Sequence, residues 1–217
     1  GEGGHNGYAG IVGIFNGGDV SPSGRENGGV GGIYGIGNSG DVAPEANSAG
    51  GGHNGEFGGV VGIGNAGSVN PSSKEGNAGV SIIAGVLNDG DVGGTTEGSS
   101  GGLGIFGVGN DGDVNPNAGE WNANSVGIFG IGNNGSVSPT SGEHNGGAGL
   151  IVGAFNNGDV KPDAGTSNGS LGIYGVGNNG SVSPKANETS NAGGGVTGGV
   201  LNNGSVSPEA GSGNGLA

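Results

Sequence analysis

The chain has 217 residues, of which 64 are glycine; hydrophobic residues make up 29% and aromatic residues 4%. This composition excludes an ordinary globular domain with a large apolar core, because little hydrophobic surface is available to offset the entropy of ordering the chain. The formal net charge of −14, from 18 acidic and 4 basic residues, excludes nucleic acid and anionic membrane surfaces as partners, since both would repel the protein.

The cellular context is limited by what the composition lacks. The chain contains no Cys and no Met, so disulfides and thiolate metal sites are excluded and side-chain oxidation is reduced. No run of about 18 apolar residues occurs, so insertion into a membrane is not predicted. The composition suits an extracellular or cell-surface protein, and the first residue, Gly rather than Met, indicates a processed product or an excised piece.

The motif N-x-G-[DS]-V recurs along the whole chain. Its nine copies are separated by 22 to 27 residues, so residues 1–217 are interpreted as a single repeat domain. We take the Asn that begins each copy as its anchor: Asn16, Asn38, Asn65, Asn88, Asn110, Asn133, Asn156, Asn178 and Asn202.

Several positions around the anchor keep their residue type. The third residue before it is always Gly, the fourth after it is always Val, and the sixth after it is Pro in every copy except the fourth, which has Gly94. The residue just before the anchor is either Gly or a large apolar residue, and where it is large the position three earlier is small, as for Leu87 and Ala84. This exchange of volume predicts that both positions lie in a close-packed interior.

Each repeat is predicted to contain the same elements in the same order. A run of four to six residues rich in Ile and Val is predicted to be a strand in each repeat, followed by the Asn-x-Gly turn, a short strand that ends at Pro, and a polar loop. Glycine at every third or fourth position disfavours a helix. A second Asn, predicted to form another turn, recurs at Asn27, Asn54, Asn77, Asn145, Asn168 and Asn214.

One repeat holds too few apolar side chains to fold alone, so stacking of repeats is expected. The sequence predicts an all-β protein: a β-solenoid of nine coils of about 22–24 residues, each rising about 4.8 Å, with an Asn ladder inside. A glycine-rich bundle of polyproline II helices is the alternative, because runs such as Gly104–Gly109 also fit a period of three. An insertion around Gly50–Gly52 is expected to bulge from one face.

The unit I-[YF]-G-[IV]-G-N, as in Ile33–Asn38 and Ile173–Asn178, resembles the strand–turn repeats of curli-type fibre subunits. The N-x-G-[DS]-V segment is similar to the coils of bacterial autotransporter passenger domains. The chain contains none of the Gln that is typical of curli repeats. What the resemblance implies is a secreted structural protein without enzymatic activity.

The glycines Gly107, Gly109 and Gly112 spell G-x-G-x-x-G, a motif that binds dinucleotides when its third Gly opens a helix. Here the third Gly leads into Asp-Val-Asn-Pro, which cannot begin a long helix. The motif occurs in five repeats, and we predict no cofactor site at any of them.

An acidic column follows the turn. Asp and Ser alternate directly before the constant Val, and the fourth and fifth copies both read NDGDV. Stacking of these copies would bring four carboxylates together, and oxygen ligands of this kind suit Ca²⁺. We therefore predict either a calcium site or a solvated acidic edge at Asp89, Asp91, Asp111 and Asp113.

The three histidines precede Asn-Gly in non-adjacent repeats, so no shared metal or catalytic site is expected from His5, His53 and His144. No Ser lies in a nucleophile elbow with a His partner, and the chain is not predicted to be an enzyme. The expected function is an extracellular structural protein: a subunit of a filament, sheath or matrix that assembles by head-to-tail stacking with itself. The alternative is a binding module, either an adhesin stalk or an ice-binding solenoid.

Overall fold

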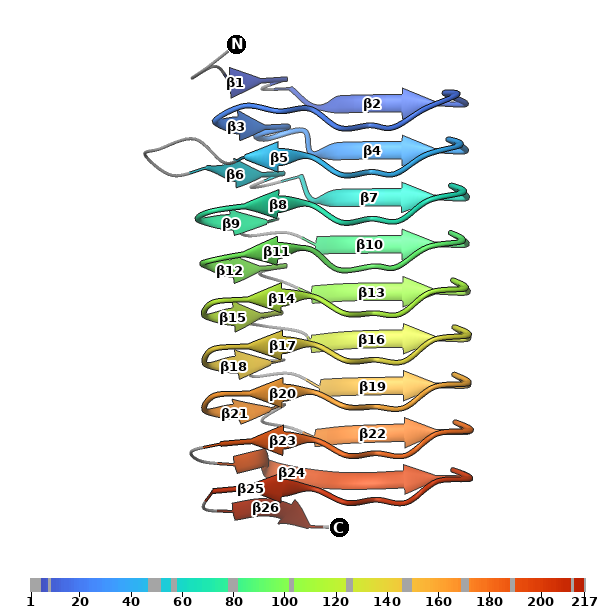
Figure 1. Ribbon diagram of the computed structural model, residues 1–217, viewed down its shortest axis with the longest axis vertical. Helices are drawn as coiled ribbons and strands as arrows, with labels where there is room; N and C mark the ends of the chain where they lie inside the picture. Colours follow the sequence, from blue (N-terminus) through green and yellow to red (C-terminus); the bar gives the residue numbers. More distant parts are fainter. Residues whose placement is uncertain are drawn as a thin grey trace.

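The computed structural model describes residues 5–7, 9–46, 52–55, 58–77, 82–101, 104–123, 127–145, 150–168, 172–187, 190–211 and 213–216. Within these ranges the chain forms β-strands, turns and bends and no helix. The strands stack along one axis into a rod, with the two ends of the chain at opposite ends (Figure 1). Residues 50 and 51 of the expected insertion lie outside the described residues.

Nine long strands form one wall of the rod in the described part of the chain. Each pairs in parallel with the long strand of the next repeat, residue for residue, so that Ile105 lies opposite Ile128 and Gly107 opposite Gly130. Repetition of the same apolar run at nearly the same spacing dictates this register, because a shift by one residue would turn the buried side chains outward. The long strands are β2 (Ile11–Ile14), β4 (Ile33–Ile36), β7 (Val60–Ile63), β10 (Ile82–Val86), β13 (Gly104–Val108), β16 (Gly127–Ile131), β19 (Leu150–Ala154), β22 (Gly172–Val176) and β24 (Ser190–Val200).

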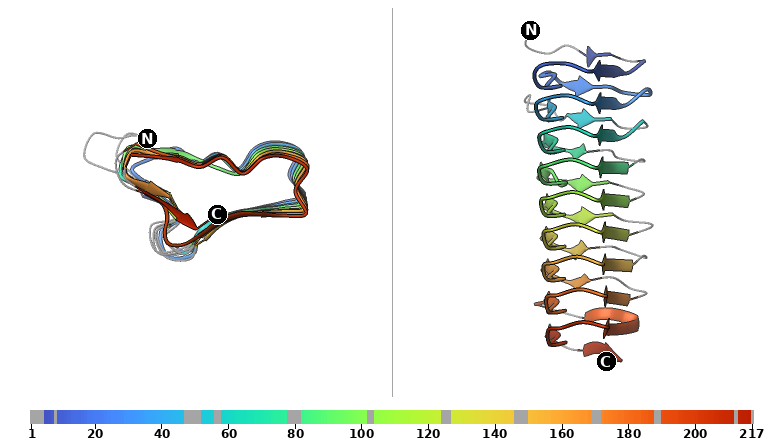
Figure 2. Two further views of the ribbon diagram at one scale, coloured as in Figure 1. Left: turned by 90° about the horizontal axis from the view of Figure 1, so that it is seen from below. Right: turned by 90° about the vertical axis from the view of Figure 1, so that its right-hand side faces the viewer.

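Two columns of short strands complete each coil (Figure 2). One column joins the long strands through β24 and contains β1 (His5–Asn6), β3 (Glu26–Asn27), β6 (His53–Asn54), β9 (Gly76–Asn77), β12 (Ser99–Ser100), β15 (Trp121–Asn122), β18 (His144–Asn145), β21 (Ser167–Asn168) and β26 (Gly213–Leu216). The other forms a separate sheet of β5 (Glu45–Ala46), β8 (Ser72–Ser73), β11 (Thr95–Thr96), β14 (Asn117–Ala118), β17 (Thr140–Ser141), β20 (Asp163–Ala164), β23 (Lys185–Ala186) and β25 (Glu209–Ala210).

The core is two aliphatic ladders that face each other across each coil. The long strands contribute a buried ladder of Ile33, Val60, Ile83, Ile105, Ile128, Ile151 and Ile173. The constant Val of the motif forms the second, in which Val20, Val42, Val69, Val92, Val114, Val137, Val160, Val182 and Val206 pair from coil to coil as isolated parallel bridges. Each coil therefore buries only two large apolar side chains here, and it does so in contact with its neighbours.

The structure confirms the predicted β-solenoid, and the alternative, a bundle of polyproline II helices, was wrong. Two predictions about the secondary structure of each repeat were also wrong. The segment predicted as a polar loop after Pro contains two short strands in most repeats. The second Asn does not form a turn: Asn27, Asn54 and Asn145 are strand residues with fully buried side chains. Pattern alone missed these strands because two-residue strands are too short to show a period of two.

The prediction that the two positions of exchanged volume, just before the anchor and three residues earlier, lie in the interior was wrong. Along β16, Ile128 and Gly130 point inward, whereas Phe129 and Ile131 point outward. The position four before the anchor, which holds Phe129, therefore lies on the outside of the long-strand wall. The position just before the anchor is also outside, since Phe15 and Leu87 are 83% and 65% exposed. The two columns belong to an external surface.

Candidate functional site

Amide side chains of the anchor residues form a buried ladder along the rod. The backbone N–H of Asn110 donates to Oδ1 of Asn133 in the next coil at 2.9 Å, and Nδ2 of Asn133 donates to the carbonyl of Gly107 at 3.4 Å. The same contact joins Asn88 to Asn110 at 2.8 Å. The predicted Asn ladder is confirmed, and its role is to accept the backbone N–H of the anchor residue one coil before it, at the turn where strand pairing ends.

A second buried ladder runs through the short strands. Nδ2 of Asn122 donates to Oδ1 of Asn145 at 2.9 Å and to the carbonyl of Thr140 at 2.8 Å, which ties two walls of the coil together. Asn145 bonds in turn to Asn168 at 3.0 Å. Ser100 occupies the corresponding position in β12 and interrupts this ladder.

The alternation of Asp and Ser has a structural cause. Oδ1 of Asp91 accepts the backbone N–H of Asp113 at 2.8 Å, and Oδ1 of Asp113 accepts the N–H of Ser136 at 2.6 Å. The hydroxyl oxygen of Ser136 then accepts the N–H of Asp159 at 3.0 Å. Either side chain can accept this bond, so the column requires an oxygen at that place and not a charge.

The four carboxylates of the predicted calcium cluster lie along the same turn but differ in their hydrogen bonding and exposure. Asp91 and Asp113 each commit one oxygen to a backbone N–H, and Oδ2 of Asp91 accepts Nδ2 of Asn115 at 3.2 Å. Asp89 and Asp111 are exposed to solvent. Among the described residues no three acidic or His side chains gather around one point. Calcium binding stays a prediction, and a calcium titration of the chain would test it.

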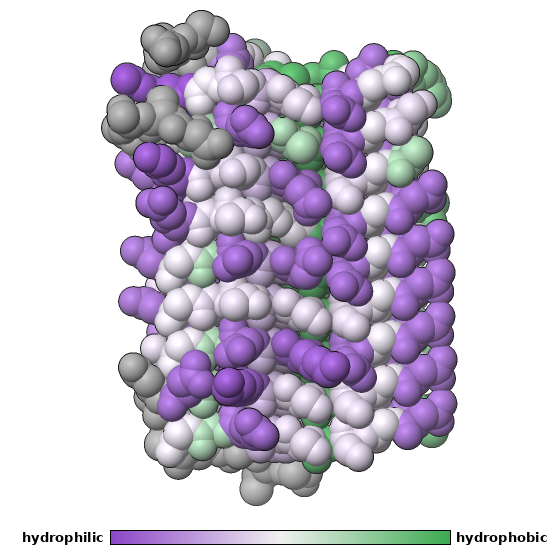
Figure 3. All heavy atoms as spheres, in the orientation of Figure 1, coloured by the Kyte–Doolittle hydropathy of each residue, from purple (hydrophilic) through white to green (hydrophobic). Residues whose placement is uncertain are grey.

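A third amide ladder lies on the surface of the turn. Asn134 donates to Oδ1 of Asp111 at 2.6 Å, and Asn157, Asn179 and Asn203 each donate to the Asn before them at 2.8 Å. All of these side chains are exposed. In Figure 3 hydrophilic side chains line the right-hand edge of the rod, where the turns lie. This ladder was not predicted from the sequence, although the recurring Asn-Asn-Gly is its signal.

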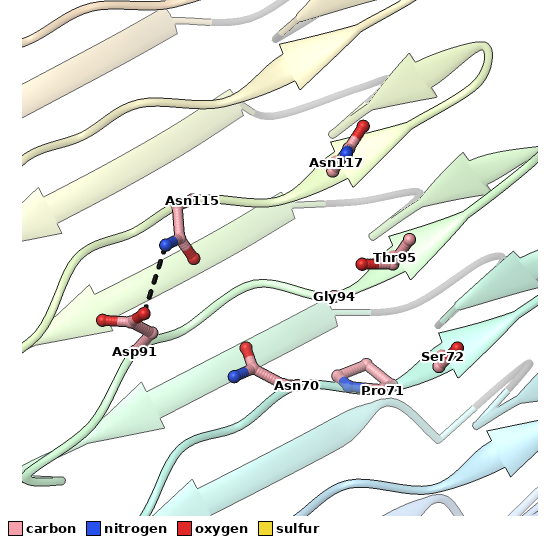
Figure 4. A pocket seen from close by; sticks show the side chains of 8 residues that line it. All are labelled: Asn70, Pro71, Ser72, Asp91, Gly94, Thr95, Asn115 and Asn117. Atoms are coloured by element: carbon pink, nitrogen blue, oxygen red, sulfur yellow. Dashed lines mark hydrogen bonds between the residues drawn. The ribbon is translucent and has the colours of Figure 1, made fainter.

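A polar hollow of about 360 Å³ opens at the one repeat that lacks Pro (Figure 4). Gly94 stands there between Pro71 and Pro116 of the neighbouring repeats and adopts φ +141°, which Pro cannot reach. The residues that line the hollow are Asn70, Pro71, Ser72, Asp91, Gly94, Thr95, Asn115 and Asn117. It is open to solvent and contains no aromatic side chain that could stack on a ligand.

The histidines lie in one column of short strands. Nε2 of His53 lies 3.1 Å from Oε2 of Glu75. His144 packs against Trp121, with ring centroids 4.1 Å apart, and its Nδ1 lies 2.7 Å from Oγ of Ser167. These contacts belong to two separate places on the rod. The strand β1 that carries His5 pairs with β3, next to β6 with His53.

The glycines of the G-x-G-x-x-G motif are explained by packing. A Cβ on Gly107 would lie 2.5 Å from Cγ2 of Val114, inside the coil, and a Cβ on Gly112 would lie 2.6 Å from the carbonyl carbon of Gly90 in the preceding coil. The motif is followed by an isolated β-bridge at Val114. It is not followed by a helix, whose N-terminus could face a phosphate. The motif therefore marks close approach between the walls and between successive coils.

Asp159 makes an ion pair with Lys161, two residues along the same coil. Burial alone raises the pKa of this carboxyl, but the Lys161 ammonium and the backbone N–H of Ser181 outweigh it and hold the pKa below its usual value. A lowered pKa in the folded state stabilises the fold above the unfolded pKa, and this stabilisation is lost as pH falls through the folded pKa.

We therefore expect Lys161→Gln to lower the melting temperature slightly at pH 7, by the equivalent of at most about 1 kcal/mol for a partly exposed pair. At a pH well below the pKa of Asp159 the two proteins should melt together. Thermal melts across pH 2–7, with the Asp159 carboxyl followed by NMR, measure both effects. An equal difference at all pH values would show that the pair does not act through this titration.

The outward side of the long strands is apolar. We call it the outer face and define it by three columns, none of which contains a charged residue or a Thr. The first is Val12, Tyr34, Val61, Ala84, Phe106, Phe129, Val152, Tyr174 and Gly198; the second is Ile14, Ile36, Ile63, Val86, Val108, Ile131, Ala154, Val176 and Val200; the third, at the corner, is Phe15, Gly37, Gly64, Leu87, Gly109, Gly132, Phe155, Gly177 and Leu201.

Neighbouring side chains of the outer face touch along the rod. The rings of Phe106 and Phe129 are nearly parallel with centroids 5.3 Å apart. The side of the molecule visible in Figure 3, which carries the separate short-strand sheet, is mostly hydrophilic or neutral. Among the described residues, most large hydrophobic side chains that remain exposed belong to the outer face. The rod is thus strongly two-sided.

Comparison with known proteins adds no family to this description. No protein-family model matches the chain, and neither a curated protein nor a solved structure matches it. In the part of the chain that the structure describes, no helix is long and apolar enough to cross a membrane. Function therefore has to be argued from the ladders and the surface of the solenoid itself.

Proposed function

We propose that the chain is a rigid structural subunit of an extracellular filament, sheath or matrix, and that subunits join end to end along the solenoid axis. The observation that carries this proposal is the translational repeat of the hydrogen-bonding pattern. Adjacent coils donate to and accept from each other in the same pattern all along the rod, as when Val20 donates to the carbonyl of Asp41 and Ala43 donates to the carbonyl of Val20, so the two ends of the rod are complementary.

Specific groups at the two ends support this. Each ladder Val donates its N–H to the following coil, from Val20 to the carbonyl of Asp41 at 2.8 Å through Val182 to the carbonyl of Ser205 at 2.9 Å. Val206 is the last of this column, and its N–H has no acceptor among the described residues. At the other end, Oδ1 of Asn16 is placed to accept from a preceding coil, as Oδ1 of Asn38 accepts from Asn16 at 3.0 Å.

A secreted location is part of the proposal and is supported by composition: no Cys, no Met and few basic residues. The resemblance of the strand–turn unit to curli-type subunits and autotransporter repeats points the same way. An adhesin stalk is the alternative and would use the same rigid rod without self-association. The outer face lacks Thr, which is the usual residue of ice-binding arrays, so ice binding has no support from that surface.

The test uses the open edge at Val206. Val206→Pro removes the N–H that a following subunit would need, while that N–H has no acceptor among the described residues of the same chain. Val206→Ala keeps the N–H and is the matched control. We expect the wild type and Val206→Ala to form filaments in negative-stain electron microscopy and Val206→Pro to remain as single short rods. Equal behaviour of all three proteins would refute end-to-end pairing.

A further inference from the structure

Four bulky residues in the corner column of the outer face have an unfavourable backbone conformation. Phe15, Leu87, Phe155 and Leu201 adopt φ between 47° and 55°, in the left-handed region that bulky L-residues rarely occupy. The other five repeats use Gly at this position, where the conformation carries no penalty. The four residues are between 65% and 85% exposed. Because they are so exposed, these side chains contribute little to the stability of an isolated rod that could offset the backbone strain.

Three of these residues are evenly spaced along the rod, in the first, fourth and seventh repeats, and Leu201 lies in the ninth. Phe15 leans over Gly37 of the next coil, Leu87 over Gly109 and Phe155 over Gly177, so that a Cβ on any of these glycines would lie within 3 Å of the large side chain. The glycines of the coils between them are uncovered: a Cβ on Gly64 or Gly132 would meet nothing within 4 Å. The corner is therefore a row of apolar projections separated by open notches.

The rest of the outer face is continuous with this corner. Ile63 and Ile131, one coil before the next projection, are both 41% exposed. None of the 27 outer-face positions is charged, although the chain carries a net charge of −14. A second copy could approach this face without bringing carboxylates together, which it could not do on the acidic sides of the rod.

The size of the face also fits a second copy. Nine strands at about 4.8 Å and five residues at about 3.3 Å each give a flat footprint of about 700 Å². A stable protein–protein interface covers about 800 Å² on each partner, and sheets that pack face to face lie about 10 Å apart.

We infer that the outer face is a lateral interface, on which a second copy of this chain packs sheet to sheet, with Phe15, Leu87, Phe155 and Leu201 as its anchoring side chains. The contact is isologous, so each residue of the face meets the same face of its partner. It is independent of the proposed end-to-end stacking, because it uses side chains on the flank of the rod and no backbone group at its ends.

The test is made in the Val206→Pro background, so that axial stacking cannot contribute to the measured mass. In sedimentation equilibrium we expect this protein to form a dimer at micromolar concentration. Ile131→Asp places a carboxylate on each side of the interface and should weaken dimerisation by about a hundredfold or more. Thr140→Asp is the matched control: it adds the same charge in the same repeat, on the separate short-strand sheet, where Thr140 is exposed.

A second variant distinguishes an interface from a structural role. Leu87→Gly relieves the left-handed strain, so its melting temperature should stay the same or rise at a concentration where the protein is monomeric, while dimerisation weakens by about tenfold or more. A protein that stays monomeric at all concentrations would overturn the inference. So would equal weakening by Ile131→Asp and Thr140→Asp, or a fall in melting temperature for Leu87→Gly without any change in association.

Discussion

Asn133→Ala is expected to destabilise the solenoid by about 1–3 kcal/mol, because it leaves the buried N–H of Asn110 without its acceptor. The side chain is 1% exposed; its Oδ1 accepts the N–H of Asn110 at 2.9 Å and its Nδ2 donates to the carbonyl of Gly107 at 3.4 Å. Alanine removes both bonds and cannot admit water to replace them without opening the coil. Chemical denaturation of the purified chain measures the loss.

The adjacent residue provides the control. Asn134→Ala makes the same chemical change one position along, where the side chain is exposed and bonds to Asp111 at 2.6 Å and to Asn157 at 2.8 Å. Water can replace these bonds, so a loss within about 1 kcal/mol is expected. Similar losses for both variants would show that the anchor amide is not the group that holds the turn.

Ile128→Ala is expected to cost about 2–5 kcal/mol, because it removes a fully buried side chain from the middle of the aliphatic ladder. Each coil has only two large apolar side chains in this core, and the rod cannot easily collapse around the space since its walls are held by hydrogen bonds. Ile131→Ala, in the same strand β16, is the control: its side chain points outward and is 41% exposed.

We expect Ile131→Ala to change the stability of the monomer by less than about 1 kcal/mol, the usual range for a partly exposed aliphatic side chain. The comparison is made at low protein concentration, so that lateral association does not contribute. If Ile131→Ala were the more damaging of the two, the inside and the outside of the long-strand wall would have to be exchanged.

Much of the fold could be predicted because one repeat constrains all the others. The constant Gly, Val and Asn around each anchor indicated stacked strands and an amide ladder, and both are present. The direction of the side chains was harder to predict. Within a repeat the sizes of two positions vary together, as in Ala84 with Leu87 and Phe106 with Gly109, and a packed interior or a shared outer surface would both produce this. Only the alternation about Ile105 and Gly107 decides between them.

The candidate site was predicted less well, for a physical reason. Asp91 and Ser136 occupy equivalent positions and both accept a backbone N–H, a role that the charge of Asp did not indicate; the predicted calcium site at Asp89, Asp91, Asp111 and Asp113 stays a prediction. Sequence identifies a residue's chemistry but not the partner that uses it. The second Asn of each repeat was ambiguous for the same reason, because the sequence does not distinguish an Asn in a turn from an Asn in a buried ladder, such as Asn145.

These features describe a rod with three different surfaces: two ends that repeat its internal hydrogen bonding, an acidic and amide-rich side, and an apolar side. In the proposed filament the ends would support axial growth and the apolar side would support lateral pairing. A filament built in this way would need no pocket and no bound ion, because its cohesion comes from backbone ladders and flat surfaces.

X-ray fibre diffraction from aligned material assembled from the unmodified chain tests the central proposal most directly. Head-to-tail stacking predicts filaments with a strong meridional reflection at about 4.8 Å, because strands of every coil lie across the filament axis. A solution of single rods that yields no oriented fibres, or fibres whose 4.8 Å reflection lies across the axis, would contradict axial assembly of the solenoid.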